Sequence, residues 1–531
     1  MNESKEQLWN RFQCRYTEFA SINLAIDLSR MDFADDYFES MDGKMQKAFA
    51  AMAALERGAI ANPDENRMVG HYWLRNPALA PTPEIRREIE STLLSIKAFA
   101  AQVHCGEVHG ESGRFRNLLL IGIGGSALGP QFVARALGHP RTDKVKVYFL
   151  DNTDPDGMDR VFAELEGALG QTLSVVISKS GSTVETRNGM VEVKYAYESS
   201  GLDFSKHAVA ITGEGSKLDN LAKSSDWLRR FPMWDWVGGR TSELSVAGLL
   251  PAAIQGIDIE ELLHGAALCD ELTRATVSRA NPAAMLSLAW YHSCKGKGLK
   301  DMVILPYKDR LELLSKYLQQ LIMESLGKEL DIHGKRVNQG ISVFGNKGST
   351  DQHSYIQQLR DGINNFFAIF VEVLQDKCSS SISVDGKTTS GDYLQGFLIG
   401  TRRALYENGR ESITLSVSSV SSFSVGVLIA LFERSVGFYA NLIEINAYHQ
   451  PGVEAGKRAA EEVITIQAKT IRFLESNRGV EFSALDIAAG IDLRSDIETV
   501  FKIAQHLAAN ADRSVVKIAG HSPVAAKFKF L

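Results

Sequence analysis

Short apolar runs, rich in β-branched residues and bounded by polar or glycine-rich turns, recur through the middle of this 531-residue chain. Such runs are typical of strands buried in a parallel sheet. A stretch with helical periodicity follows most of them, and this alternation is the pattern of βαβ units. We therefore predict strands at 118–121, 145–150, 175–177, 209–212, 302–305, 341–344, 366–373 and 413–417.

The two ends of the chain have a different pattern, one that predicts helices. Residues 44–55 are alanine-rich, and residues 83–101 are amphipathic with a proline near the start. A long helical stretch also begins near Pro451. The predicted fold is α/β, with parallel sheets between helical ends. Its segments are an N-terminal helical segment over 1–112, α/β domains over 113–282 and 283–450, and a C-terminal helical segment over 451–531.

Composition and charge exclude several classes of protein. Apolar residues make up 44% and charged residues 23%, as in ordinary globular proteins. The net charge of −6 argues against a general nucleic-acid surface. The five cysteines form no CxxC pair, which argues against a disulfide framework or a cysteine zinc site. The N-terminus is too polar for a signal peptide, and we expect no membrane-spanning run. We therefore expect a cytoplasmic protein without nucleic-acid or membrane partners.

The turn after the predicted strand 175–177 has the chemistry of an anion site. It reads SKSGST (178–183), and the sequence after it looks helical. Free N–H groups and the dipole at a helix start favour an anion, hydroxyls add donors, and Lys179 adds a charge. Gly181 allows the backbone to turn close to a ligand. The alternative is a Ser/Thr-rich helix cap with a solvated lysine.

A second glycine-rich turn follows the strand 118–121. The glycines of GIGGSA (122–127) fit a dinucleotide-binding fingerprint, and Asp151 ends the next strand where a ribose-binding acid would lie. Gly125 and Ser126 also make this a hydroxyl-bearing turn that suits a sugar or phosphate. Two such turns on neighbouring strands suit a phosphorylated small molecule.

Arg240 and Glu324 are candidates for acid–base and electrostatic catalysis. Arg240 follows two glycines, and its guanidinium suits a delocalised oxyanion, although a surface salt bridge is the simpler interpretation. Glu324 lies at the edge of an apolar stripe on a predicted helix over 309–326, a position that suits a general base. The alternative is a rim glutamate paired with Lys328.

His353 is a candidate for proton exchange. Ser349 and Gln352 have the spacing of a capping box, which predicts His353 in the first turn of a helix. Histidine exchanges protons near neutral pH, although a lone histidine near a cap is more often structural.

Six motifs, in order and at compatible spacing over about 60–470, resemble the glucose-6-phosphate isomerase (phosphoglucose isomerase) family. They are IGIGGSALGP (121–130), SKSGSTVET (178–186), WVGGRTS (236–242), MESLGKE (323–329), GSTDQHSYIQQLRDG (348–362) and QPGVEAGK (450–457). The resemblance implies two sugar-isomerase (SIS-type) α/β domains flanked by helices, and usually a homodimer. The short turn at 180–182 and Pro451, in place of a tryptophan, indicate the bacterial or plant-type branch.

The resemblance also implies roles for individual residues. Glu324 would move a proton between C1 and C2 of a sugar phosphate, and Arg240 would stabilise the cis-enediolate. His353 would open the sugar ring, with Lys457 assisting, while Glu185 matches a family position without a firm role. Residues that would bind the substrate are Ser178, Lys179, Ser180, Thr183 and Thr186 at the phosphate, and Gly125, Ser126 and Gln450 at the sugar.

The predicted activity is the interconversion of glucose 6-phosphate and fructose 6-phosphate. An aldose–ketose isomerisation needs a base, a cation for the enediolate and a ring-opening acid–base, so we expect no cofactor and no metal. Two alternatives stay open. One is a nicotinamide oxidoreductase that uses the Gly122 loop and Asp151, and the other is a non-catalytic sugar-phosphate sensor.

Overall fold

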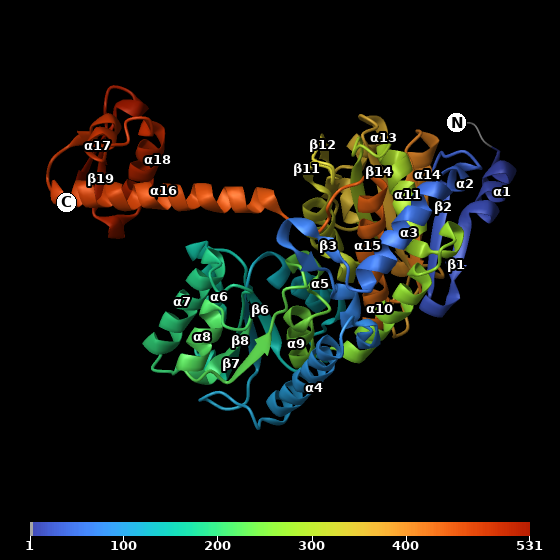
Figure 1. The fold of residues 1–531 in the computed structure, drawn as a ribbon, viewed down its shortest axis with the longest axis horizontal. Helices are drawn as coiled ribbons and strands as arrows, with labels where there is room; N and C mark the ends of the chain where they lie inside the picture. Colours follow the sequence, from blue (N-terminus) through green and yellow to red (C-terminus); the bar gives the residue numbers. More distant parts are fainter. Residues whose placement is uncertain (1–3) are drawn as a thin grey trace. The chain divides into compact units, whose positions relative to one another are not determined.

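The chain divides into two units, Met1–His449 and Gln450–Leu531. The computed structural model describes residues 4–531, except for the side chains of residues 454 and 455. Figure 1 shows that the first unit contains the large sheets and most helices, whereas the second is built around the C-terminal part of a long helix.

A fully parallel sheet with strand order β6-β5-β7-β8-β9 forms one half of the first unit. Its central strand β7 is buried at every position, as its apolar sequence predicts. Because β5 and β7 are parallel neighbours, the turns that follow them meet at one edge of the sheet. The strands are β5 (Asn117–Ile121), β6 (Lys146–Leu150), β7 (Thr172–Ile177), β8 (Ala208–Thr212) and β9 (Arg229–Pro232).

The second sheet is mixed, with strand order β1-β2-β17-β14-β10-β13. Every strand predicted from the sequence has a counterpart in one of the two sheets. The N-terminal segment, predicted from its pattern as helical, also contributes strands to this sheet: β2 pairs antiparallel with β17, and β1 pairs antiparallel with β2. The strands are β1 (Tyr16–Phe19), β2 (Leu24–Arg30), β10 (Asp301–Pro306), β13 (Val343–Phe344), β14 (Phe366–Val373) and β17 (Ser412–Val417).

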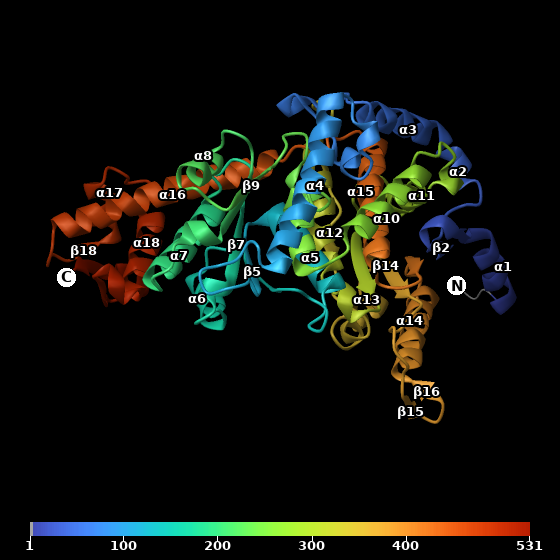
Figure 2. The ribbon, with the colours of Figure 1, turned by 90° about the horizontal axis from the view of Figure 1, so that it is seen from below.

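Helices cover both sheets. The predicted N-terminal helices are α3 and α4, and α14 begins next to a small hairpin of β15 (Ser383–Asp385) and β16 (Thr388–Thr389), seen at the bottom of Figure 2. The α-helices of the first unit are α1 (Lys5–Arg15), α2 (Tyr37–Ser40), α3 (Asp42–Glu56), α4 (Pro83–Cys105), α5 (Leu128–Leu137), α6 (Pro155–Glu164), α7 (Val184–Ser199), α8 (Lys217–Ser224), α9 (Val246–Gln255), α10 (Ile259–Thr273), α11 (Pro282–Cys294), α12 (Leu314–Leu318), α13 (Ile356–Asp361), α14 (Ser390–Glu407) and α15 (Ser422–Leu442).

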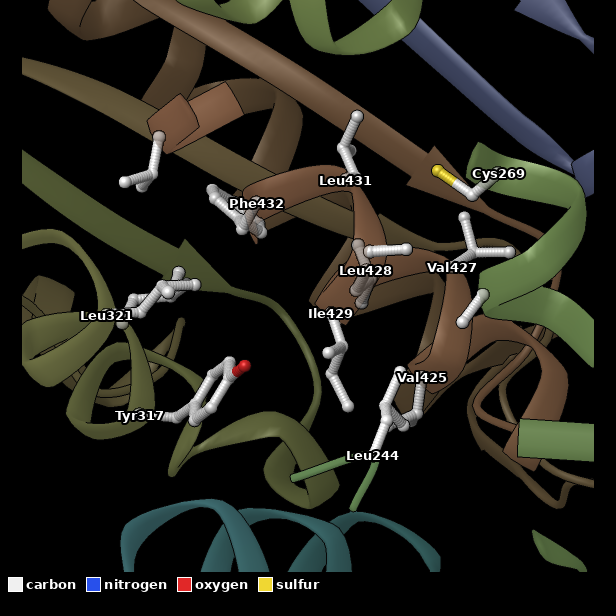
Figure 3. Close-up of a cluster of buried hydrophobic side chains, with 14 of the residues drawn as sticks. Leu244, Cys269, Tyr317, Leu321, Val425, Val427, Leu428, Ile429, Leu431 and Phe432 are labelled. Carbon is white, nitrogen blue, oxygen red and sulfur yellow. The ribbon is translucent and has the colours of Figure 1, made fainter. Parts of the chain in front are cut away.

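Helix α15 is the centre of the main hydrophobic core. Its Leu428 and Ile429 lie near Tyr317 and Leu321 in Figure 3, and all four side chains are buried. By length and composition α15 could cross a membrane, so the prediction that no run is long enough was wrong. Of the most apolar 18-residue stretch of α15, 94% is buried inside the protein, which makes it a core helix.

The second unit has a core of its own, which includes Leu474, Ile487, Val500 and Phe528. Its helices were predicted, but its three-stranded sheet, of order β18-β20-β19, was not. Strands this short become recognisable only when they pair. The elements are α16 (Pro451–Ser476), α17 (Ala484–Gly490), α18 (Ile497–Ala509), β18 (Phe482–Ser483), β19 (Val515–Ile518) and β20 (Lys527–Phe530).

Candidate active site

Two glycine turns of the first unit pack backbone against backbone. The 3₁₀ turn Gly124–Ser126 follows β5, and the 3₁₀ turn Gly239–Thr241 lies against it. A Cβ atom added to Gly125 would lie only 1.9 Å from the carbonyl oxygen of Gly239. Ser242 Oγ also donates a hydrogen bond to Gly125 O at 3.2 Å. Glycine is therefore required here, because the turn that holds Ser126 must approach the loop that carries Arg240.

The hydroxyl-rich turn lies between β7 and α7. Ser178 Oγ bonds to Thr183 Oγ1 at 3.3 Å and accepts from the backbone N–H of Gly181 at 3.1 Å. Gly181 has φ +65°, and a Cβ there would collide with Leu218. Thr183 is the N-cap residue of α7 but makes no side-chain cap bond, so the simple helix-cap interpretation does not describe it. The turn thus presents preorganised hydroxyls at a helix start.

The other hydroxyls of this segment differ in exposure. Ser180 Oγ and Ser182 Oγ are hydrogen-bonded at 2.8 Å, and both residues are exposed. Thr186, in the first turn of α7, is only 3% exposed. Its hydroxyl makes no hydrogen bond to any other part of the chain that the structure describes.

Lys179 joins the hydroxyl turn to the segment that leads to Arg240. Its ammonium donates to the carbonyl oxygens of Asp235 at 3.0 Å and Val237 at 3.3 Å. It also lies 3.3 Å from the carboxylate of Asp235. Burial lowers the pKa of Lys179, and the Asp235 carboxylate opposes this shift. Lys179 therefore fixes a neighbouring loop, in addition to placing a positive charge near the turn.

Glu324 lies at the end of a π-helix. The sequence predicted one α-helix over 309–326, but the structure has a 3₁₀ turn, then α12, then a π-helix over Gln319–Glu324. The prediction of a uniform helix was wrong because an apolar stripe does not distinguish helix types. π-helical turns are frequent at functional sites. A Cβ at Gly124 would lie 3.1 Å from Gln320 Nε2, so the π-helix faces the first glycine turn.

Arg240 and Glu324 form a pair at the centre of these turns. Arg240 Nε lies 3.6 Å from Glu324 Oε2, and their side chains are 4% and 18% exposed. The guanidinium also donates to the carbonyl oxygens of Ala447 at 3.3 Å and His449 at 3.4 Å. Burial lowers the pKa of Arg240 and Glu324 opposes that shift, but an arginine remains charged. The pair can take a proton and stabilise an anion at the same place.

His353 lies on the surface of the first unit. It is exposed and ends a 3₁₀ turn over Thr350–His353. The predicted capping box does not form, because Ser349 makes no side-chain cap bond to this turn. The α-helix begins only at Ile356, as α13. Spacing alone cannot tell a 3₁₀ turn from the first turn of an α-helix.

Gln450 and Lys457 belong to the second unit. Gln450 precedes α16, and Lys457 lies within that helix. Their predicted roles at the site of the first unit therefore stay predictions.

A cavity beside the Arg240–Glu324 pair reveals residues that the sequence analysis missed. His71 is fully buried, and both its ring nitrogens lack a hydrogen-bond partner among the described residues. Burial lowers its pKa well below the usual value, and Arg75 and Arg434 add to the shift. The available sequence signal for His71 was its place, with Arg75, in the otherwise apolar and aromatic segment HYWLR (71–75). With Arg240, the cavity is lined by Arg67, His71, Lys179, Ser325, Glu433 and Tyr448.

Asp151, the ribose-binding acid of the dinucleotide alternative, is hydrogen-bonded within the protein. The Asp151 carboxylate accepts a hydrogen bond of 2.7 Å from Gln131 of α5. Over residues 4–531 no group of three or more histidine, cysteine, aspartate or glutamate side chains is placed to hold a metal ion.

Comparison with known proteins gives one consistent answer. The profile of the family described as phosphoglucose isomerase matches residues 27–478. Proteins named glucose-6-phosphate isomerase from Geobacter sp. (strain M21) and Geotalea daltonii are each 58% identical, over 96% and 99% of both chains respectively. A crystal structure of a glucose-6-phosphate isomerase from Chlamydia trachomatis superposes with a TM-score of 0.79 at 26% identity, covering 88% of this chain and 92% of that one. This chain belongs to the phosphoglucose isomerase family.

Proposed function

We propose that this chain interconverts glucose 6-phosphate and fructose 6-phosphate through ring opening and a cis-enediolate intermediate. The observation that carries the proposal is the pair of Arg240 and Glu324, with 3.6 Å between Nε and Oε2, beside the two anion-friendly turns. A carboxylate next to a buried guanidinium supplies the base and the oxyanion partner that an aldose–ketose isomerisation needs. Family membership over most of the chain supports the same activity.

The proton transfer follows from this geometry. Glu324 removes the proton from C2 of the open-chain aldose, a C1–C2 double bond forms, and the electron pair moves to O1. Arg240 stabilises the resulting cis-enediolate, because its charge faces the place where negative charge develops. Glu324 then returns the proton to C1 as the carbonyl forms at C2, and the hydroxyl proton that leaves O2 passes to O1. The reaction is redox-neutral overall.

The sugar and phosphate are held by the glycine and hydroxyl turns. Ser178, Ser180, Thr183 and Thr186 bind the phosphate with the helix start of α7, and Lys179 adds charge. Gly125 and Ser126 approach the sugar from the first turn. We include Gln450 at the sugar and Lys457 at ring opening, on the strength of the family motif that contains them.

Replacing both Ser180 and Thr183 by alanine should weaken substrate binding, with KM rising more than kcat falls. Each hydrogen bond to a charged group contributes about 1.5–3 kcal/mol. Steady-state kinetics should show this, and Ser200→Ala, at the exposed far end of α7, is the matched control. An unchanged KM in the double variant would place the phosphate elsewhere.

His353 is proposed to open the ring, so His353→Ala should impair the cyclic substrate far more than an open-chain analogue. Its exposed position leaves the imidazole accessible to a sugar oxygen. The measurement is the ratio of kcat/KM for the two substrates in parent and variant. Equal losses on both substrates would indicate a structural histidine.

Oligomeric state and location complete the proposal. As is usual in this family, the chain forms a homodimer and acts in the cytoplasm, with a sugar phosphate as its partner. Sedimentation of the purified protein tests the first statement.

The activity itself is tested by adding the purified chain to fructose 6-phosphate without nicotinamide and following the sugar signals by NMR. Glucose 6-phosphate should accumulate, and the same final mixture should be reached from either substrate. Binding without turnover would favour a sugar-phosphate sensor. Turnover only after addition of NAD or NADP would favour an oxidoreductase.

A further inference from the structure

Lys328 binds the backbone of the proposed base. It begins the strand β11 (Lys328–Leu330), and its side chain turns back toward the end of the π-helix. Its ammonium donates to the carbonyl oxygen of Glu324 at 2.7 Å and to that of Ser325 at 2.8 Å. The residue is only 5% exposed. The sequence had offered Lys328 as a partner for the Glu324 side chain, but these bonds are to main-chain oxygens.

These two bonds cap the helix end that carries Glu324. The last carbonyl groups of a helix lack intrahelical partners and carry partial negative charge, which a lysine can satisfy. A lysine is rarely buried unless its charge is matched. Two short bonds to successive carbonyls fix the position of the ammonium and, through it, the backbone of Glu324.

Lys328 interacts with both positive and negative groups. Arg240 and His449 are the cationic or titratable groups that act on it or on which it acts, and the Glu324 carboxylate is the negative group. Burial lowers the pKa of Lys328 to about 7, Arg240 adds to this shift, and Glu324 opposes it. Burial also lowers the pKa of His449, and Lys328 contributes to that shift. Lys328 is therefore charged below pH 7 and increasingly neutral above it.

We propose that Lys328 is a positioning residue for the isomerisation: its ammonium, bound to two successive carbonyl oxygens, holds the main chain of Glu324 in place. This inference rests on the proposed function, in which Glu324 is the carbon base. A base that moves by a fraction of an ångström removes the C2 proton less often. The hydroxyl-rich turn between β7 and α7, which is proposed to bind the phosphate, lies on another element, so substrate affinity should depend little on Lys328.

The test compares Lys328→Met, which removes the ammonium at similar length, with Lys328→Arg, which keeps a charge that does not titrate. Lys335→Met is the matched control, because Lys335 is an exposed lysine in the loop between β11 and β12 (Arg336–Gln339). We expect Lys328→Met to lower kcat roughly 10- to 100-fold with KM nearly unchanged. Thermal melting and binding of a substrate-analogue inhibitor, measured in each variant, report whether the fold is retained.

The pH dependence separates positioning from a purely structural role. The ratio of parent kcat to Lys328→Met kcat should grow as the pH falls from 8 to 6, because the parent then carries the ammonium charge that strengthens the two bonds to the main-chain oxygens. Lys328→Arg should show no such trend relative to the parent below pH 7. A ratio that is constant with pH, or a parent-like kcat in Lys328→Met, would overturn the inference while the parent remains active. An inactive parent would overturn the proposed function, and this inference with it.

Discussion

Replacing Glu324 by glutamine should lower kcat by about 10²- to 10⁴-fold, the usual contribution of a positioned base. The variant keeps the volume and polarity of the side chain but cannot accept the C2 proton. Arg240 would still face this place, since its guanidinium also donates to the carbonyl oxygens of Ala447 and His449. Binding of a phosphorylated inhibitor should be nearly intact, because the Ser178 turn lies on a different element.

Solvent exchange at C2 of the substrate provides the decisive measurement. In deuterated water the parent should incorporate deuterium at C2, and Glu324→Gln should lose exchange and isomerisation together. Glu329→Gln is the control, because Glu329 is an exposed glutamate of the same motif, paired on the surface with Arg336. If Glu324→Gln exchanged the C2 proton at the parent rate, another group would have to be the base.

Replacing Arg75 by methionine should destabilise the first unit by about 3–5 kcal/mol, the cost of breaking one side of a buried ion pair. Arg75 Nε lies 2.6 Å from Asp270 Oδ2, and Nη1 lies 2.6 Å from Glu433 Oε2. The side chains of all three are 0–1% exposed. Arg434 extends the network to Glu56, at 2.6 Å. Methionine would leave the buried carboxyl groups of Asp270 and Glu433 short of one cation.

Urea unfolding followed by tryptophan fluorescence should show the loss as a lower midpoint. Burial already raises the pKa of Glu433 to about 7 in spite of Arg75. An acid with a raised pKa loses its contribution to stability as pH rises through that value, and removing Arg75 raises it further. The deficit of the variant should therefore widen above pH 7. Arg86→Met, which removes an exposed ion pair with Glu90, should cost less than about 1 kcal/mol. If Arg75→Met lowered the free energy of unfolding no more than Arg86→Met does, the buried ion-pair network would not stabilise the first unit as predicted.

Local sequence patterns were sufficient to predict elements whose structure depends mainly on their own residues. The runs at 175–177 and 366–373 could be recognised as strands because a parallel strand covered on both faces is mostly apolar. The glycines at 125 and 181 could be linked to ligand turns because their conformational freedom is a property of the residue. The motifs around Arg240 and Glu324 pointed to isomerase chemistry before their distance was known.

Features that depend on partners distant in the sequence could not be read in this way. The strand β2 joins β17, nearly four hundred residues later, and its antiparallel register is set by that neighbour. The sheet of the second unit likewise needs three short segments to meet. For His353, the spacing of a capping box was present, but the backbone adopted a 3₁₀ turn without the expected bond.

The sequence by itself determined the α/β class, the strand-ending turns and the choice of candidate site residues, because these follow from residue type and short-range periodicity. Only the tertiary structure decided that Arg240 lies 3.6 Å from Glu324, that the helix bearing Glu324 is π-wound, and that Lys328 binds its carbonyl oxygen. It also decided that Arg75 and Glu433 share a buried network beside this site. The physical reason is that hydrogen bonds and ion pairs depend on distances of a few ångströms between segments far apart in the chain, and such distances are fixed only when the whole core packs.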